Sequence, residues 1–229
     1  MDNFIVNSIP KEQTYEWLLK KHYAKRIPSI VYSFGLYRDN ILEGVITYGI
    51  PPAENCMLSC GEDYKDKTLE LNRVIKNDNL GKNVQSYFIS QTFKLLPKPQ
   101  VIISYADPNN GHYGYCYQSL NFLYTGEGGS DREMVFRNKQ YTTRHIKDYW
   151  FKSWGLDYDS SKTINENFLN AGGEIIPMTK KKRYILFIGS KTQKKDMRKK
   201  LKWDVKPYPK GINRNYDTKY NTQTQCQLF

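Results

Sequence analysis

Cysteine and histidine are scarce in this chain, which has four of the former and three of the latter among 229 residues. No C-x-x-C pair occurs, and only Cys56 and Cys60 are close in sequence. This pattern indicates a reducing compartment and no disulfide framework. His22, His112 and His145 do not combine with the cysteines in a spacing typical of a metal site. The spacing therefore gives no support for a metal centre and leaves the question open.

Long apolar runs are also missing. The N-terminal residues MDNFIVNSIPKEQ have neither the basic start nor the apolar core of a signal peptide, and no stretch approaches the length of a membrane span. We therefore expect a soluble, cytoplasmic protein, and membrane-surface binding through a basic segment stays open. The apolar fraction of 39% is enough for a real core, which argues against wholesale disorder.

Acidic residues are nearly absent from one part of the chain. Residues 177–220 contain fifteen Lys and Arg residues and three Asp residues, whereas residues 1–176 contain twenty bases and twenty acids. The whole formal net charge of +12 thus lies in the C-terminal segment. A polyanion such as nucleic acid is the expected partner of this segment. A solubilising charged surface is the alternative.

The order of the expected elements is that of a mixed α/β protein. Apolar patterning predicts strands over 4–9, 30–38, 41–50, 68–75, 101–106, 123–126 and 183–189, and helices over 10–23, 82–96 and 112–122. Weaker patterns suggest a strand over 134–141 and a helix over 163–171. We expect a catalytic domain over 1–190 and, over 191–229, a basic extension that is partly irregular.

The first candidate site residue is Arg73, in the expected strand TLELNRVI. Strict alternation along a strand places Arg73 on the same face as Leu69 and Leu71, which is otherwise apolar. A buried arginine needs an anionic partner. That partner is either a ligand or a structural carboxylate such as Asp107, and the sequence leaves both open.

The turn before the expected second helix is a candidate phosphate cradle. Asn79, Leu80, Gly81, Lys82 and Asn83 precede the helix, whose first N–H groups would point above the sheet. This turn has a single glycine, so an ordinary helix start is the competing interpretation and is slightly favoured.

Polar side chains also follow the buried strand 101–106. Asp107 stands at its carboxyl end, where open α/β sheets place ligands. It can act as a general base or as the N-cap of the next turn, and we favour the functional role. His112 suits proton transfer, although a lone histidine is more often structural. Tyr117 can donate a proton or stack on a base.

Five segments, in this order, resemble the Mom family of phage proteins: HYAKRIPS, GVITYGIPP, LELNRVI, GKNVQSYFIS and ISYADPNNGHYGYCYQSLNFLYTG. They cover most of residues 15–126, and the pattern ISYAD…GH.G..YQ..NF.Y.G in the last of them is the most specific. The resemblance implies a GNAT-like (acetyltransferase-type) α/β fold, with a mixed, mostly antiparallel sheet flanked by helices.

The resemblance also implies a function. It implies conversion of adenine in double-stranded DNA to N6-carbamoylmethyladenine, which protects phage DNA from restriction in the cytoplasm of the infected bacterium. Matching motif positions give Arg73, Asp107 and Tyr117 as catalytic residues. The expected donor-binding residues are Asn83, Ser86, Gly81 and Lys82. The expected DNA-binding residues are His22, Tyr23, Lys25, Arg26, His112, Lys181, Lys182, Lys195, Arg198 and Lys199.

The group donor stays open. An acyl-CoA, an aminoacyl carrier such as a charged tRNA, and participation of iron are the alternatives, and the oligomeric state is equally open. Two other functions compete with adenine modification. One is a conventional N-acetyltransferase that uses acetyl-CoA on a protein or small amine, which the single-glycine turn argues against. The other is a DNA-binding protein without catalytic activity.

Overall fold

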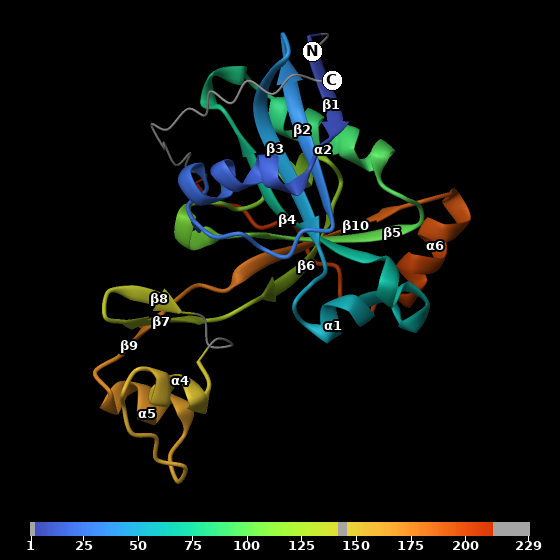
Figure 1. Ribbon diagram of the computed structural model, residues 1–229. Coiled ribbons are helices and arrows are strands. Elements are labelled where there is room, and N and C mark those ends of the chain that lie inside the picture. The colour runs from blue at the N-terminus through green and yellow to red at the C-terminus, as the bar shows by residue number, and fades with distance from the viewer. Residues whose placement is uncertain (1–2, 142–145, 213–229) are drawn as a thin grey trace.

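The computed structural model describes residues 3–141 and 146–212, in which a twisted seven-stranded sheet forms the centre (Figure 1). Only β4 and β5 pair in parallel, and every other neighbouring pair is antiparallel. The expected mixed, mostly antiparallel sheet is confirmed. Its strands, in spatial order, are β1 (Phe4–Ser8), β2 (Tyr32–Arg38), β3 (Ile41–Gly49), β4 (Thr68–Lys76), β5 (Gln100–Ala106), β10 (Lys181–Ile188) and β6 (Leu123–Gly128).

Helices cover both faces of this sheet. On one face α2 (Val84–Leu95) buries Phe88 and Ile89 in the largest core, beside α3 (Tyr115–Ser119). On the other face α6 (Lys191–Lys200) buries Met197 beside Cys56 of α1 (Glu54–Met57). None of the helices in the described residues is long and apolar enough to cross a membrane.

A small second unit projects from the ends of β6 and β10 (Figure 1). It contains a three-stranded sheet of β8 (Lys139–Tyr141), β7 (Arg132–Phe136) and β9 (Glu174–Pro177), with α4 (Asp148–Ser153) and α5 (Ile164–Asn170). Its aromatic core is separate from those of the main sheet. The expected strand over 134–141 is wrong, because a turn with positive φ at Arg137 and Asn138 divides it into β7 and β8.

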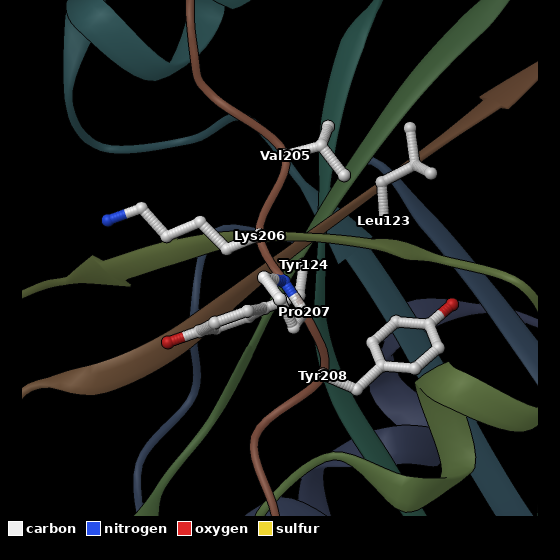
Figure 2. Close-up of a pocket in the computed structure, with 6 residues that line it drawn as sticks. All are labelled: Leu123, Tyr124, Val205, Lys206, Pro207 and Tyr208. Carbon is white, nitrogen blue, oxygen red and sulfur yellow. The ribbon is translucent and has the colours of Figure 1, made fainter.

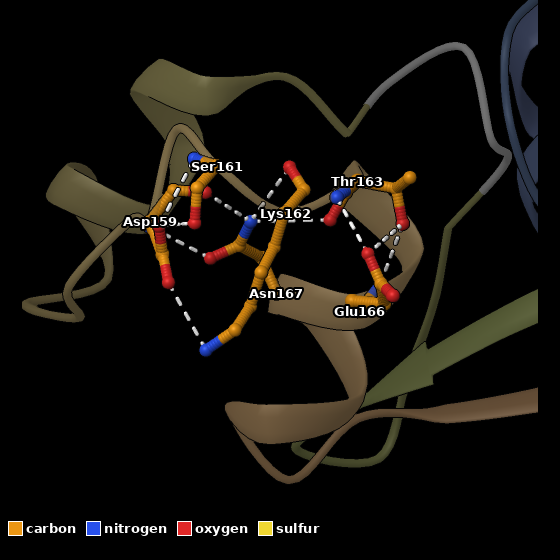
Figure 3. A network of polar contacts seen from close by, with 6 residues as sticks. All are labelled: Asp159, Ser161, Lys162, Thr163, Glu166 and Asn167. Atoms are coloured by element: carbon orange, nitrogen blue, oxygen red, sulfur yellow. Dashed lines mark hydrogen bonds and ion pairs between the residues drawn. The ribbon is translucent and has the colours of Figure 1, made fainter.

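The expected helix over 163–171 is confirmed as α5, and its start is fixed by a polar network (Figure 3). Thr163 and Glu166 form a capping box, in which the side chain of each accepts a hydrogen bond from the backbone of the other. Asn167 donates to the carbonyl of Asp159 and accepts from its backbone N–H, both at 2.8 Å. These bonds tie the preceding loop to the helix.

Two expected helices differ in the structure. The segment 10–23 forms a 3₁₀ turn, Lys11–Thr14, and a π-helical turn, Trp17–Lys21, in place of one α-helix. The segment 112–122 is helical only as α3, because Gly114 has φ +81 and the chain must approach the ring of Tyr184. A Cβ at Gly114 would lie 2.4 Å from that ring, so the backbone cannot continue as a helix there.

The described part of the extension is not detached from the domain. Residues 201–212, which we call the strap, have no regular structure but follow the edge strand β6. Lys206 N–H donates to the Tyr124 carbonyl at 2.8 Å, and the Tyr208 hydroxyl donates to the Phe122 carbonyl at 2.8 Å. Figure 2 shows Val205–Tyr208 of the strap beside Leu123 and Tyr124 of β6. These six residues line a pocket of about 170 Å³. Residues 213–229 lie outside the described residues.

Candidate functional site

The candidate site lies where β4 and β5 separate. Their parallel pairing covers only Thr68–Glu70 of β4 against Val101–Ile103 of β5. Beyond that point the Ser104 hydroxyl donates to the Leu71 carbonyl at 2.8 Å. A side-chain hydrogen bond thus joins β5 to β4 where their backbone-to-backbone pairing has ended. Two parallel strands that diverge leave room for side chains from both to meet at their carboxyl ends.

A β-bulge in β4 sets the direction of Arg73. Tyr48 of β3 pairs with Leu71, whereas the preceding Thr47 pairs with Arg73, so Asn72 is the extra residue. The expectation that Arg73 shares a face with Leu69 and Leu71 is therefore wrong. The bulge turns Arg73 to the opposite face, which it shares with its partner Thr47.

Arg73 is largely buried without a carboxylate bound to it. One terminal nitrogen donates to the Asn72 carbonyl at 2.5 Å, and the buried Nε has no hydrogen-bond partner. Burial is the main cause that lowers the pKa of Arg73, and the nearby charge of Arg26 acts in the same direction. The considered salt bridge to Asp107 is not formed, because Asp107 pairs with Lys181.

Asp107 is buried, with 6% of its surface exposed, and both of its oxygens are engaged. Oδ1 accepts from the backbone N–H of Asn109 at 3.1 Å and from its side-chain amide at 3.0 Å. Oδ2 lies 3.4 Å from Nζ of Lys181. Asp107 is thus the N-cap of the turn Pro108–Asn110, which was the structural alternative. Only Oδ2, with its longer contact, has room to act on a substrate.

Tyr117 of α3 lies on the face covered by α2 and interacts electrostatically with Arg73. Its ring packs 5.3 Å from that of Phe122 and 5.4 Å from that of Tyr184. Burial strongly raises the pKa of Tyr117. The phenol is therefore protonated at neutral pH, which suits it to donate a proton or a hydrogen bond and excludes a role as a base.

His22 follows the π-helical turn and is 5% exposed. Its Nδ1 accepts a hydrogen bond from the backbone N–H of Ala24 at 3.0 Å, and its ring packs 4.3 Å from that of Tyr23. Burial first, and then the positive charges of Arg73 and Lys181, lower the pKa of His22 to about 3. The ring is neutral at physiological pH and cannot serve as a general acid.

Seven sequence-predicted residues are connected with Arg73, directly or through one another, by contacts or electrostatic interactions: His22, Tyr23, Arg26, Asp107, His112, Tyr117 and Lys181. Burial lowers the pKa of His112, and the neighbouring carboxylate of Asp107 opposes this in part. Lys25 lies three residues after the buried His22 and is exposed. The structure therefore brings together all three predicted catalytic residues and half of the predicted DNA-binding ones.

The other predicted DNA-binding residues lie elsewhere. Lys182 pairs with Glu127 of β6. Lys195, Arg198 and Lys199 are exposed on α6, which packs on the face of the sheet opposite α2.

The predicted donor-binding residues form the start of α2. Gly81 has φ +87, and Asn83 is the left-handed residue before the helix. The Ser86 hydroxyl donates to the Asn83 carbonyl at 2.9 Å, and Lys82 is exposed. A Cβ at Gly81 would meet no atom of the chain within 4 Å, so the requirement for glycine in this turn is its positive φ.

Lys21 is a residue that sequence reasoning missed. It is 3% exposed and lies 3.2 Å from the carboxylate of Asp78. This pair joins the segment that carries His22 to the turn that leads into α2. Nothing in the sequence distinguishes Lys21 from the neighbouring Lys20, because the π-helical turn that buries it is not encoded by a simple apolar period.

No group of three or more His, Cys, Asp or Glu side chains in the described ranges is arranged to hold a metal ion. His145 lies outside these ranges. Most of the polar atoms around Arg73 are nitrogen atoms that carry protons. Such N–H groups bind anions and do not ligate cations.

The fold and site define a mixed α/β protein with a group of cationic side chains near the point where β4 and β5 separate. The model of the Mom protein family matches residues 3–210, and the chain belongs to this family. A relative is the methylcarbamoylase mom of Escherichia phage Mu, which is 26% identical over 199 residues, covering 83% of this chain and 77% of that protein.

Two solved acetyltransferases are also similar. An N-acetyltransferase from Staphylococcus aureus Mu50 has a TM-score of 0.44 and 14% identity, over 81% of this chain and 99% of that one. A putative acetyltransferase from Acinetobacter baylyi ADP1 has a TM-score of 0.45 and 11% identity, over 82% of this chain and 94% of that one.

Proposed function

We propose that this protein is a transferase that modifies adenine in double-stranded DNA to N6-carbamoylmethyladenine, in the cytoplasm of a phage-infected bacterium. The single observation that carries the proposal is that a Mom family protein has Arg73 in electrostatic interaction with Tyr117 and, through His22 and Lys181, connected to Asp107. The name of the phage Mu relative describes a methylcarbamoylase, which agrees with the proposed product.

The target nitrogen is paired in duplex DNA, so the base must leave the helix. Flipping a base costs a few kcal/mol, which contacts to phosphates and stacking on aromatic rings offset. Arg26, Lys181 and Arg73 supply positive charge around His22, and Tyr23 supplies a ring already packed on that histidine. These parts suit a nucleotide drawn out of the duplex.

The proposed chemistry forms a bond between adenine N6 and the methylene carbon of the donor. The bond from that carbon to its leaving group breaks, and the leaving group keeps the electron pair. Oδ2 of Asp107 orients the amino group and accepts its proton as the bond forms. The Tyr117 phenol, kept protonated by burial, donates to the leaving group. Arg73 holds a negative group of the donor.

We also propose that the basic face of α6 contacts the DNA backbone away from the reacting base. Lys195, Arg198 and Lys199 are exposed, and no ion pair is found for them within the described residues. Contacts of this kind add affinity without sequence preference.

The test is to express the protein in a bacterium and digest plasmid DNA to nucleosides for mass spectrometry. We expect carbamoylmethylated deoxyadenosine with the wild type and at least a tenfold decrease with Arg73→Gln or Tyr117→Phe. Asp131→Asn is the matched control, since Asp131 is exposed and pairs only with its neighbour Arg132. Unmodified DNA from a folded, abundant protein would favour a conventional N-acetyltransferase or a DNA-binding protein without activity.

A further inference from the structure

The small unit is joined to the main sheet by two chain segments, residues 129–131 and 178–180, which we call the neck (Figure 1). A backbone hydrogen bond of 2.7 Å joins the two segments. The second segment leads into Lys181, the first residue of β10, and Nζ of Lys181 lies 3.4 Å from Oδ2 of Asp107. One end of the neck therefore lies beside the candidate catalytic carboxylate.

The side chain of Asn109 joins this neck to Asp107. Its amide nitrogen donates to Oδ1 of Asp107 at 3.0 Å and to the Thr179 carbonyl at 2.8 Å. Its amide oxygen accepts from the backbone N–H of Thr179 at 3.0 Å. All three contacts require the same orientation of the amide, because a carboxylate and a carbonyl only accept and a backbone N–H only donates. Asn109 thus uses both amide hydrogens and the amide oxygen at once.

Each oxygen of Asp107 therefore has a partner that is connected with the neck. Oδ1 is bound by Asn109, which pairs with Thr179, and Oδ2 lies near Lys181, two residues further along the chain. The backbone of Asp107 is fixed as well, because its carbonyl accepts two backbone hydrogen bonds from the turn that follows. The remaining freedom of Asp107 is rotation of its carboxylate, which the Asn109 amide restrains.

The exposure of Asn109 allows positioning to be separated from stability. Asn109 is exposed, and its backbone N–H caps the turn at 3.1 Å whatever side chain it carries. Loss of the amide leaves Oδ1 of Asp107 with one hydrogen bond, so no buried polar group becomes unpaired. A variant at this position should therefore keep the fold and change only the orientation of the carboxylate and its connection to the neck.

We propose that Asn109 is a positioning residue: it holds Oδ1 of Asp107 so that Oδ2 is directed at the substrate, and it ties this carboxylate to the neck of the small unit. The inference rests on the proposed function, in which Oδ2 accepts the proton of adenine N6. It adds a role for the small unit, which takes part in orienting the catalytic carboxylate through the neck.

Two variants separate the two contacts of Asn109. Asn109→Ala loses the bonds to Asp107 and to Thr179. Asn109→Asp keeps an oxygen that accepts from the Thr179 N–H, but it loses the donor to Asp107 and places a second carboxylate beside it. Asn110→Ala is the matched control, because Asn110 lies in the same turn and no side-chain hydrogen bond of Asn110 is found in the part of the chain that the structure describes.

Each full-length protein is first studied by NMR without DNA. The ¹³Cγ shift of Asp107, assigned by its absence from Asp107→Asn, reports the hydrogen bonds of the carboxylate. Amide exchange of Thr179 reports the connection to the neck. We expect a changed Asp107 shift in both Asn109 variants and faster Thr179 exchange in Asn109→Ala alone. Asn110→Ala should give wild-type values. An unchanged Asp107 shift in Asn109→Ala overturns the proposal, because the amide then has no effect on the carboxylate.

Carbamoylmethylated deoxyadenosine is then measured in plasmid DNA, relative to the amount of folded protein. A hydrogen bond to a charged group corresponds to a factor of about ten or more in an equilibrium. We therefore expect about tenfold less adduct from both Asn109 variants and the wild-type amount from Asn110→Ala. Wild-type amounts from either Asn109 variant overturn the positioning role. Retention by Asn109→Asp alone would assign the effect to the neck contact and not to Asp107.

The two measurements also separate failure of this inference from failure of the proposed function. The NMR shifts need neither DNA nor a group donor. Absence of adduct from the wild type overturns the proposed function and the positioning role with it, whatever the Asp107 shift shows. Adduct from the wild type with an unchanged Asp107 shift in Asn109→Ala overturns the role of Asn109 alone.

Discussion

Replacement of Gly114 by alanine tests how the structure places Tyr117. Gly114 precedes α3 with φ +81 and ψ +25, and a Cβ there would lie 2.4 Å from Cε2 and 2.6 Å from Cζ of Tyr184. Tyr184 is completely buried and cannot move away freely, because its hydroxyl donates to the Tyr113 carbonyl at 2.5 Å and accepts from Gln118 at 3.1 Å.

The expected cost has two parts. The left-handed conformation costs an alanine about 1–2 kcal/mol, and forcing a methyl group into a packed core costs about 1–3 kcal/mol. We therefore expect Gly114→Ala to lower the free energy of unfolding by about 2–5 kcal/mol, measured by urea denaturation. Because α3 must shift, adduct formation should fall at least tenfold in protein that is still folded.

Gly172→Ala is the control for the first part alone. Gly172 has φ +83, and a Cβ there would meet no atom within 4 Å. This variant should lose only about 1–2 kcal/mol and keep its activity. If both variants lose the same stability, the close approach of Gly114 to Tyr184 has no energetic consequence and the reasoning is refuted.

Three further predictions follow from the same structure. The pKa of His22 falls from 6.5 to about 3 on folding, so the unfolded chain binds the extra proton below pH 6.5 and stability is lost as the pH falls. Urea titrations at pH 7 and pH 5 should differ by up to about 2 kcal/mol on this account, less in His22→Gln, and an unchanged difference contradicts it. Tyr117→Phe should keep its stability within about 1 kcal/mol but lose at least tenfold in adduct yield, and wild-type yield refutes its role as donor. Replacing Lys195, Arg198 and Lys199 by Gln should lower the slope of log K against log salt by up to about 3, at about 0.9 per lost phosphate contact, in a filter-binding assay; an unchanged slope removes α6 from the DNA surface.

The sheet could be predicted from the sequence because its strands have local signals. The Asp39-Asn40 turn, with both residues at positive φ, marks the β2–β3 hairpin as expected. The bulge in β4 could not be predicted, since it depends on pairing with β3 and changes no residue type. One extra residue at Asn72 moved Arg73 to the other face.

The sequence predicted which residues belong to the candidate site better than it predicted how these residues are arranged. The polar residues after β5 and the His22 loop were identified, and the structure brings them to Arg73. Asp107 serves as the N-cap of a proline-led turn, which is the structural role that the sequence offers as the alternative, and its catalytic role stays a prediction. The pairing of Asp107 with Lys181 joins residues far apart in sequence, which no local pattern encodes.

The small unit was missed because its core is made of aromatic residues from short elements. Phe136, Phe151 and Phe168 come from three of them, and none has the length that gives a clear apolar period. The strap was expected to be irregular, and residues 201–212 confirm this. The strap is held near β6 by isolated hydrogen bonds from Lys206 and Tyr208 to the carbonyls of Tyr124 and Phe122. Isolated bonds of this kind leave no periodic pattern in the sequence.

The most direct test of the central claim is the amount of N6-carbamoylmethylated deoxyadenosine made by Asp107→Asn. Asparagine keeps the acceptor that caps the turn Pro108–Asn110 and removes the charge that accepts the proton. Tandem mass spectrometry of plasmid nucleosides should locate the adduct on N6 with the wild type and show at least a hundredfold less with Asp107→Asn, in protein of unchanged fold. Wild-type amounts of adduct from Asp107→Asn, or no adduct from the wild-type protein, would contradict the account.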